Sequence, residues 1–174
     1  MATKRFVYSF IILLVACTCL MGIVTPASAE TLNYKIYTYV TKAESAPVGD
    51  VGEHYLAFTT RRAFLVFENG EIATQRSVIT SEEIKGNRTS LQYTTITFSD
   101  GSTIILRFQN TVTATPSGAP ASAIMIPQII KGTGRFEGIK GTGSTKVKYF
   151  PVEEGEGGPK GYGEGTLTFT LPSK

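Results

Sequence analysis

From Glu30 onwards, the chain consists of short runs in which apolar and polar residues alternate, separated by turn residues. Such runs, rich in tyrosine and β-branched residues, are typical of β-strands. We expect strands at residues 32–40, 53–60, 62–67, 71–80, 89–98, 102–115, 144–152 and 164–171. Because no stretch of 10 residues in this part shows helical periodicity, the pattern of about eight strands predicts an all-β sandwich or barrel.

Two dipeptides mark tight turns between neighbouring strands. Asn69-Gly70 separates two runs of strand type, and Asp100-Gly101 separates two more. Asn-Gly and Asp-Gly are strong signals for two-residue hairpin turns because both positions tolerate positive φ. The sequence therefore predicts two antiparallel hairpins.

The alternation also predicts which side chains face the interior, because successive side chains on a strand point to opposite faces. In residues 102–115, Asn110 shares a face with large apolar residues, and in residues 53–60 His54 shares a face with Leu56. We assign these apolar faces to the interior. The expected cavity lining is Phe58, Leu106, Phe108, Leu167 and Phe169.

Residues 1–29 have the pattern of a secretory signal. Lys4 and Arg5 precede an apolar run at residues 6–24, and Ala27-Ser28-Ala29 is a small-residue cleavage site. We expect cleavage there, which leaves residues 30–174 as one secreted or periplasmic domain. Two alternatives remain: an apolar run of about 20 residues can span a bilayer, and the residues before Cys17 resemble a lipidation site.

Both cysteines lie in the predicted signal segment, so the mature chain has no disulfide and no thiolate metal site. A single histidine also excludes a multi-histidine metal site. The net charge of +3 becomes about +1 when Lys4 and Arg5 are removed, which argues against a general binder of nucleic acid. We expect no cofactor and no nucleic-acid partner.

Three polar residues are candidates for catalysis. His54 could act as a general acid or base in a pocket, or be a satisfied, partly buried strand residue. Asn110, placed among apolar neighbours, must find a hydrogen-bond partner in a neighbouring strand or in a ligand. Tyr149 could orient a substrate with its phenol or belong to the core.

The pentapeptide Ile-Lys-Gly-Thr-Gly occurs twice, at residues 130–134 and 139–143. Its glycine spacing fits neither the P-loop nor the dinucleotide-binding motif, and no amphipathic helix follows it to present a dipole to an anion. The glycines instead predict a tight turn between two strands. We expect Phe136, within this turn, to plug the barrel end or its flank.

These residues carry a resemblance to a known family. The segment at residues 131–144 resembles the Gly-Thr-Gly-x-Phe-x-Gly-x-x-Gly segment shared by plant dirigent proteins and allene oxide cyclases, and residues 98–110 are similar to the preceding strand pair of dirigent proteins. The resemblance implies an eight-stranded antiparallel, calycin-like β-barrel with an apolar cavity, often assembled as a trimer. Its bacterial relatives include cyclases of polyketide-type products.

The resemblance implies more about the fold than about catalysis. The cyclases use a glutamate, an asparagine and a tyrosine in the cavity, and only Asn110 comes from a matching segment; the aspartates and arginines of dirigent proteins have no counterpart at matching motifs. We therefore expect a secreted barrel that binds a small apolar molecule and, if it is an enzyme, acts as an isomerase or cyclase. The alternative is a structural or interaction barrel with a filled interior.

Overall fold

The computed structural model of the protein describes residues 28–112 and 122–173, and the predicted signal sequence lies outside them except for its last two residues. The strands are β1 (Glu30–Pro47), β2 (His54–Phe67), β3 (Ile72–Ile84), β4 (Asn87–Phe98), β5 (Thr103–Val112), β6 (Ser122–Met125), β7 (Gln128–Thr133), β8 (Lys140–Tyr149) and β9 (Gly161–Thr170), with a short 3₁₀ helix, η1 (Gly134–Phe136). No helix in the described ranges is long and apolar enough to cross a membrane.

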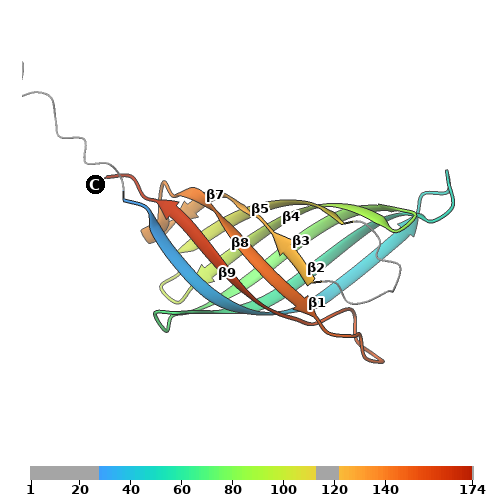
Figure 1. The fold of residues 1–174 in the computed structure, drawn as a ribbon, viewed down its shortest axis with the longest axis horizontal. Coiled ribbons are helices and arrows are strands. Elements are labelled where there is room, and N and C mark those ends of the chain that lie inside the picture. The colour runs from blue at the N-terminus through green and yellow to red at the C-terminus, as the bar shows by residue number, and fades with distance from the viewer. Residues whose placement is uncertain (1–27, 113–121, 174) are drawn as a thin grey trace, which may run out of the picture.

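All strand pairs are antiparallel, and they close into a barrel (Figure 1). The order around the wall is β1-β2-β3-β4-β5-β7-β8-β9, and β9 returns to β1. The ninth strand, β6, pairs with β8, as β7 does, and Ile126-Pro127 separates β6 from β7 along the chain. Proline has no N–H to donate to a ladder, which accounts for the interruption. The predicted all-β, eight-stranded antiparallel barrel is confirmed.

The two predicted hairpins form, but with a longer turn than the sequence suggested. Phe67 donates its N–H to the carbonyl of Glu71, which leaves three residues in the loop, and Gly70 alone adopts a positive φ, of 84°. The Asn69 side chain accepts a hydrogen bond from the Glu71 N–H at 3.0 Å. The turn at Asp100-Gly101 repeats this arrangement. Asparagine and aspartate thus serve as acceptors, and glycine supplies the left-handed residue.

One end of the barrel is closed by aromatic side chains. Phe136 in η1 is only 4% exposed, and its ring lies 4.8 Å from that of Phe98 and 6.0 Å from that of Phe169. The row of rings continues through Phe67 to Tyr34. The guanidinium of Arg135 covers it, 4.7 and 4.8 Å from the centroids of Phe98 and Phe136. The prediction that Phe136 plugs the barrel is confirmed.

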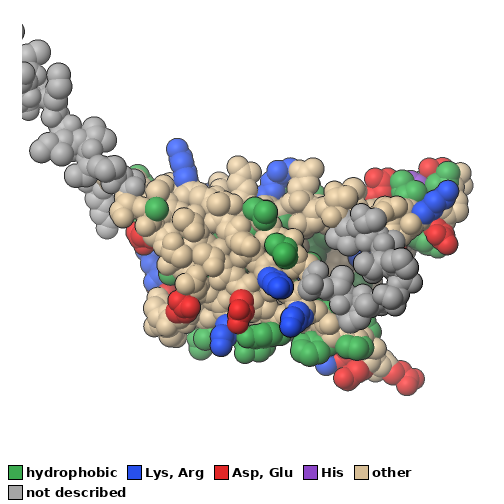
Figure 2. All heavy atoms as spheres, in the orientation of Figure 1, with side chains coloured by type: hydrophobic (Ala, Val, Ile, Leu, Met, Phe, Trp, Pro, Cys, Tyr) green, Lys and Arg blue, Asp and Glu red, His purple; other side chains and the backbone are tan. Residues whose placement is uncertain are grey.

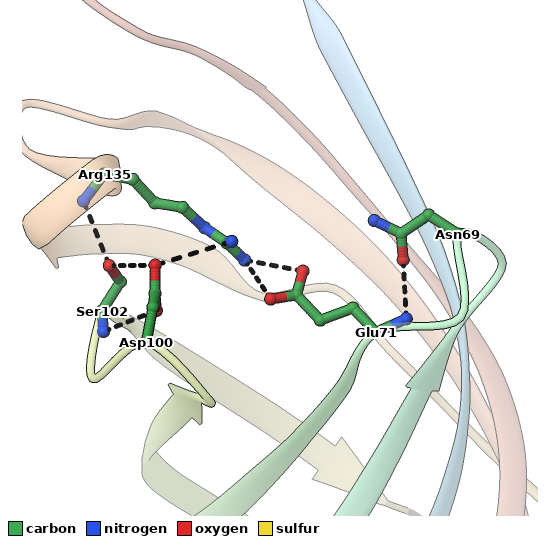
Figure 3. Close-up of polar contacts among 5 residues, drawn as sticks. All are labelled: Asn69, Glu71, Asp100, Ser102 and Arg135. Carbon is green, nitrogen blue, oxygen red and sulfur yellow. Dashed lines mark hydrogen bonds and ion pairs between the residues drawn. The ribbon is translucent and has the colours of Figure 1, made fainter.

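Polar contacts hold this plug against two hairpin turns (Figure 3). Arg135 donates from Nη2 to both carboxylate oxygens of Glu71, each at 2.6 Å, and its Nη1 lies 3.6 Å from Asp100. Its backbone N–H donates to the hydroxyl of Ser102, which donates to Asp100. Hydrogen bonds between charged groups are stronger than neutral ones. The β2–β3 turn, the β4–β5 turn and η1 are therefore tied together.

The repeated Ile-Lys-Gly-Thr-Gly is explained by close packing rather than by phosphate binding. A Cβ atom on Gly132 would lie 2.1 Å from the carbonyl oxygen of Phe136, and one on Gly141 would lie 2.2 Å from that of Thr168. Both distances are far inside van der Waals contact, so only glycine fits where the chain enters and leaves the plug. The repeat specifies the closed end of the barrel.

At the opposite end, the described strands differ in how far they extend. β1 pairs with β9 only as far as Thr38, but its pairing with β2 continues to Pro47. On the other side of the wall, β5 pairs with β7 only over residues 103–107, while its pairing with β4 reaches Val112. The ends of β1 to β5 therefore project beyond β7 to β9, away from η1 (Figure 1).

Candidate functional site

Beyond the plug, the inner face of β3 and β4 carries a cluster of polar side chains. The hydroxyls of Ser77 and Thr94 lie 2.8 Å apart, Gln75 donates to Ser77 at 3.2 Å, and Gln92 donates to Thr94 at 2.9 Å. All four side chains are buried, and Ser77 is completely inaccessible. Buried polar groups are costly unless they are hydrogen-bonded. The cluster meets this requirement.

Arg61 on β2 is in register with Ser77 and places a charged group on the inner face next to this cluster. Its Nη2 donates to the carbonyl of Pro159 at 2.8 Å, its Nε donates to the hydroxyl of Thr38 at 3.3 Å, and the guanidinium carbon lies 5.1 Å from the ring centroid of Tyr149. Burial lowers the pKa of the Arg61 guanidinium. The side chain is half-buried and is held by two other strands, β1 and β8, and by the loop before β9.

A hollow of about 340 Å³ opens above Arg61 at the barrel mouth. Its size lies in the range of small-molecule sites. It is bordered by apolar groups from β1, β2 and β3, by small hydroxyls, and by the loop before β9. The main side chains are Val40, Ala43, Ala57 and Ile79 (apolar), Ser45, Thr59, Ser81 and Ser90 (hydroxyl), and Arg61 and Arg88 (charged).

A second, wider hollow of about 690 Å³ follows the projecting ends of β1 to β5. Most of its side chains belong to the outer face of the sheet, with Leu56, Phe58 and Leu91 as its large apolar members. Asn110 borders it from β5. It lies mostly on the outside of the wall, and it adjoins the mouth hollow, with which it shares Glu44, Ser45, Ala57, Ser81 and Ser90.

The predicted cavity residues divide into two groups. Leu106, Phe108, Leu167 and Phe169 are at most 4% exposed and belong to the packed core. The prediction that Phe58 faces the interior is wrong, because its side chain is 38% exposed and lies on the outer face. Alternation separates the two faces of a strand but does not say which face is inside. Here the part of β2 that carries Phe58 extends beyond the packed core.

His54 also lies away from the barrel interior, contrary to the sequence prediction. Its Nδ1 lies 2.6 Å from Asp50 and its Nε2 lies 3.0 Å from Glu82, so two carboxylates bury it at the start of β2. Figure 2 shows the histidine beside acidic side chains at the tip of the projecting strands. The hydrogen bond to Asp50, opposed by burial and aided by Glu82, raises the pKa of His54, and the same bond lowers the pKa of Asp50.

The other two catalytic candidates lie at different places in the wall. Tyr149, at the end of β8, is half-buried beside Arg61. Asn110 is half-buried on β5 and is paired through its backbone with Ser90. Among the described residues, no hydrogen bond joins His54, Asn110 and Tyr149 to one another, so the structure does not assemble them into one site. Their catalytic roles stay predictions.

Sequence reasoning missed Arg61. Strand alternation could have found it, because Ala63, Leu65 and Phe67 are buried and Arg61 lies one step earlier on the same face. In the described part of the chain, no group of three or more His, Cys, Asp or Glu side chains could hold a metal ion. Figure 2 shows basic and acidic side chains scattered on the face over β8 and β9, without a block of one sign.

No family model and no curated protein sequence matches this chain. Among solved structures, the pterocarpan synthase dirigent protein GePTS1 superimposes with a TM-score of 0.53 at 16% identity, over 83% of this chain and 92% of that chain. The pterocarpan synthase dirigent protein PsPTS1 gives a TM-score of 0.49 at 17% identity, over 84% and 97%. The first match shows that this protein has a dirigent-like barrel fold.

Proposed function

We propose that this dirigent-like barrel holds a small, largely apolar molecule in its mouth hollow and guides the cyclisation or isomerisation of that molecule. The observation that carries the proposal is the hollow itself, at one end of a barrel whose other end is plugged by Phe136. Apolar walls with a few fixed polar groups are the usual make-up of a ligand site.

The geometry supports guidance through shape. A ligand in the hollow would have the packed core on the side of the plug. Arg61 borders the hollow and is held by Thr38, the Pro159 carbonyl and the Tyr149 ring. It would fix one end of the ligand, while Val40 and Ile79 confine the apolar body. Holding one conformer of a flexible molecule favours an intramolecular reaction, because the ordering cost is already met.

One observation favours the alternative, a non-catalytic barrel. The interior from the plug up to Leu106 is packed without a described void, as expected for a barrel filled by its own side chains. The two functions differ in whether the mouth hollow takes up a ligand. The dirigent-like fold is compatible with both, so binding decides between them.

The test combines native mass spectrometry of the purified protein with calorimetric titration of 2-naphthamide, a neutral apolar probe. We expect a retained molecule or binding of the probe, and loss of both in Thr59→Phe, which fills the hollow from the inner face of β2. Thr60→Phe, the next residue on the opposite face, is the matched control and should bind normally. A protein that retains nothing and binds no probe would instead support the non-catalytic barrel.

Localisation and assembly are part of the same proposal. The signal pattern of residues 1–29 supports a secreted or periplasmic protein, with lipid attachment at Cys17 as the lesser alternative. The sequence resemblance supports a trimer. Size-exclusion chromatography with light scattering measures the mass in solution, and a mass of one chain at working concentration would contradict the trimer.

A further inference from the structure

Arg61 carries a charge that the protein itself does not neutralise. Among the described residues, no carboxylate lies within 4.0 Å of its guanidinium, and its contacts are a carbonyl, a hydroxyl and a ring. The other arginine of the mouth, Arg88, donates to Glu83 at 2.8 Å. Arg135 at the plug has Glu71. A half-buried cation without a counter-ion is unfavourable unless something else compensates its charge.

The free donors of Arg61 are available to a ligand. Its Nε and one N–H of Nη2 are used, whereas Nη1 has no hydrogen-bond partner among the described residues. In the same part of the chain, no buried side-chain nitrogen or oxygen lacks a partner. Nη1 is therefore accessible, and Arg61 borders the mouth hollow. A guanidinium with unused N–H groups is suited to paired contacts with a carboxylate.

The remainder of the hollow does not oppose an anion. Glu44 is the acidic residue among its borders, and that carboxylate is exposed and paired with Lys42 at 2.9 Å. The nearby hydroxyls of Thr59 and Ser81 can donate to an anion as well as accept from a neutral group. The apolar walls still call for an apolar ring or chain in the rest of the ligand.

Resting on the function proposed above, we propose that the ligand of the mouth hollow is an organic acid, whose carboxylate binds the guanidinium of Arg61 and whose apolar body lies against the walls formed by Val40, Ala57 and Ile79. This sharpens the expectation of an apolar ligand: the molecule is amphipathic, with its charged end directed toward Arg61. Its orientation in the hollow is then fixed by charge and not by shape alone.

The test compares two probes of nearly the same shape, 2-naphthoate and 2-naphthamide, in calorimetric titrations at neutral pH and low salt. We expect naphthoate to bind about ten-fold more tightly or better, because a charge-assisted contact is stronger than a neutral one. Arg61→Gln should remove this preference and Arg61→Lys should keep part of it. Arg62→Gln, which removes the same charge from the exposed outer face of β2, should leave the preference intact.

Each outcome has a distinct meaning. Equal affinity for the two probes overturns the organic-acid inference but leaves the proposed function standing. A preference for naphthoate that persists in Arg61→Gln overturns the assignment to Arg61. If neither probe binds and native mass spectrometry finds no retained molecule, the proposed function fails and the inference fails with it, whereas a retained molecule without an acidic group overturns the inference alone. If Arg61→Gln does not fold, the wild-type comparison and Arg61→Lys still decide the question.

Discussion

Phe136 should be a main determinant of stability, although it lies in a three-residue helix rather than in a strand. Its ring packs against Phe98 and Phe169 and is covered by Arg135. Phe136→Ala removes the ring from the closed end of the barrel and leaves a cavity between three strands and η1. The neighbouring backbone cannot collapse into this cavity easily, because Gly132 already lies against the Phe136 carbonyl.

The magnitude follows from the burial and the ring contacts. Full burial of a phenylalanine side chain contributes about 1.5–3 kcal/mol, and each ring pair adds about 0.5–1.5 kcal/mol. We therefore expect Phe136→Ala to lower the free energy of unfolding by about 3–5 kcal/mol, the range found for buried phenylalanine. This is a large part of the total stability of a small domain, which is about 5–15 kcal/mol.

Urea unfolding followed by circular dichroism measures the change. Phe150→Ala is the matched control, because Phe150 is 56% exposed, and it should cost less than about 0.5 kcal/mol. Phe136→Leu keeps most of the volume and should cost about 1 kcal/mol, so it remains measurable if the alanine variant does not fold. A loss below about 1 kcal/mol for Phe136→Ala would refute the view that this ring closes the barrel.

Three further predictions concern other contacts. Tyr34→Phe removes the buried hydroxyl that lies 2.6 Å from Thr145, and urea unfolding should show a loss of about 1–3 kcal/mol because Thr145 loses its partner. Gly165→Ala should cost about 1–3 kcal/mol, since its Cβ would lie 2.3 Å from the Tyr34 ring, and an unchanged urea midpoint would contradict that crowding. At the tip of the projecting strands, the pKa of His54 is raised above 6.5 and the pKa of Asp50 is lowered below 3.8. The stabilisation by protonated His54 should therefore be lost as the pH rises through the native pKa of His54. The stabilisation by ionised Asp50 should be lost as the pH falls through the native pKa of Asp50. The protection factors of amide hydrogen exchange at the tip should therefore be highest between these values, and His54→Gln should abolish their loss on the alkaline side.

The strands and their hairpins could be predicted because they depend on local sequence. Alternation over residues 103–112 places Leu106 and Phe108 in the core, as the structure has them. The turn at Asn69-Gly70 was located correctly, although its length depends on the Glu71 N–H that the asparagine side chain binds. Local sequence patterns therefore predict where the strands and turns lie, but not the lengths of the turns.

The two orientation errors have one physical cause. His54 and Phe58 lie in the part of β2 that projects past the core, where neither face is covered by the opposite wall. There, apolar residues no longer mark the interior. How far one strand outruns its neighbours depends on the register of β1 with β9, which joins residues more than 100 positions apart in the sequence and leaves no local signal.

The mouth site was missed for the same reason. Arg61 meets the Pro159 carbonyl 98 positions later and the Tyr149 ring from another strand. Taken alone, Arg61-Arg62 looks like a pair of solvated charges on a strand. Alternation places Arg61 on the face of the buried Ala63, but only closure of the barrel brings Arg61 to Pro159 and Tyr149.

The two ends of the barrel therefore have different roles. At the closed end, Arg135 is neutralised by Glu71 and stacked on the plug, so its charge contributes to stability. At the other end, the described partners of Arg61 are neutral, and we propose that its charge serves a ligand. Because the packed core separates the ends, substitutions at the plug should change unfolding without changing the preference for an acid, and Arg61→Gln should change that preference with a smaller effect on unfolding than Phe136→Ala.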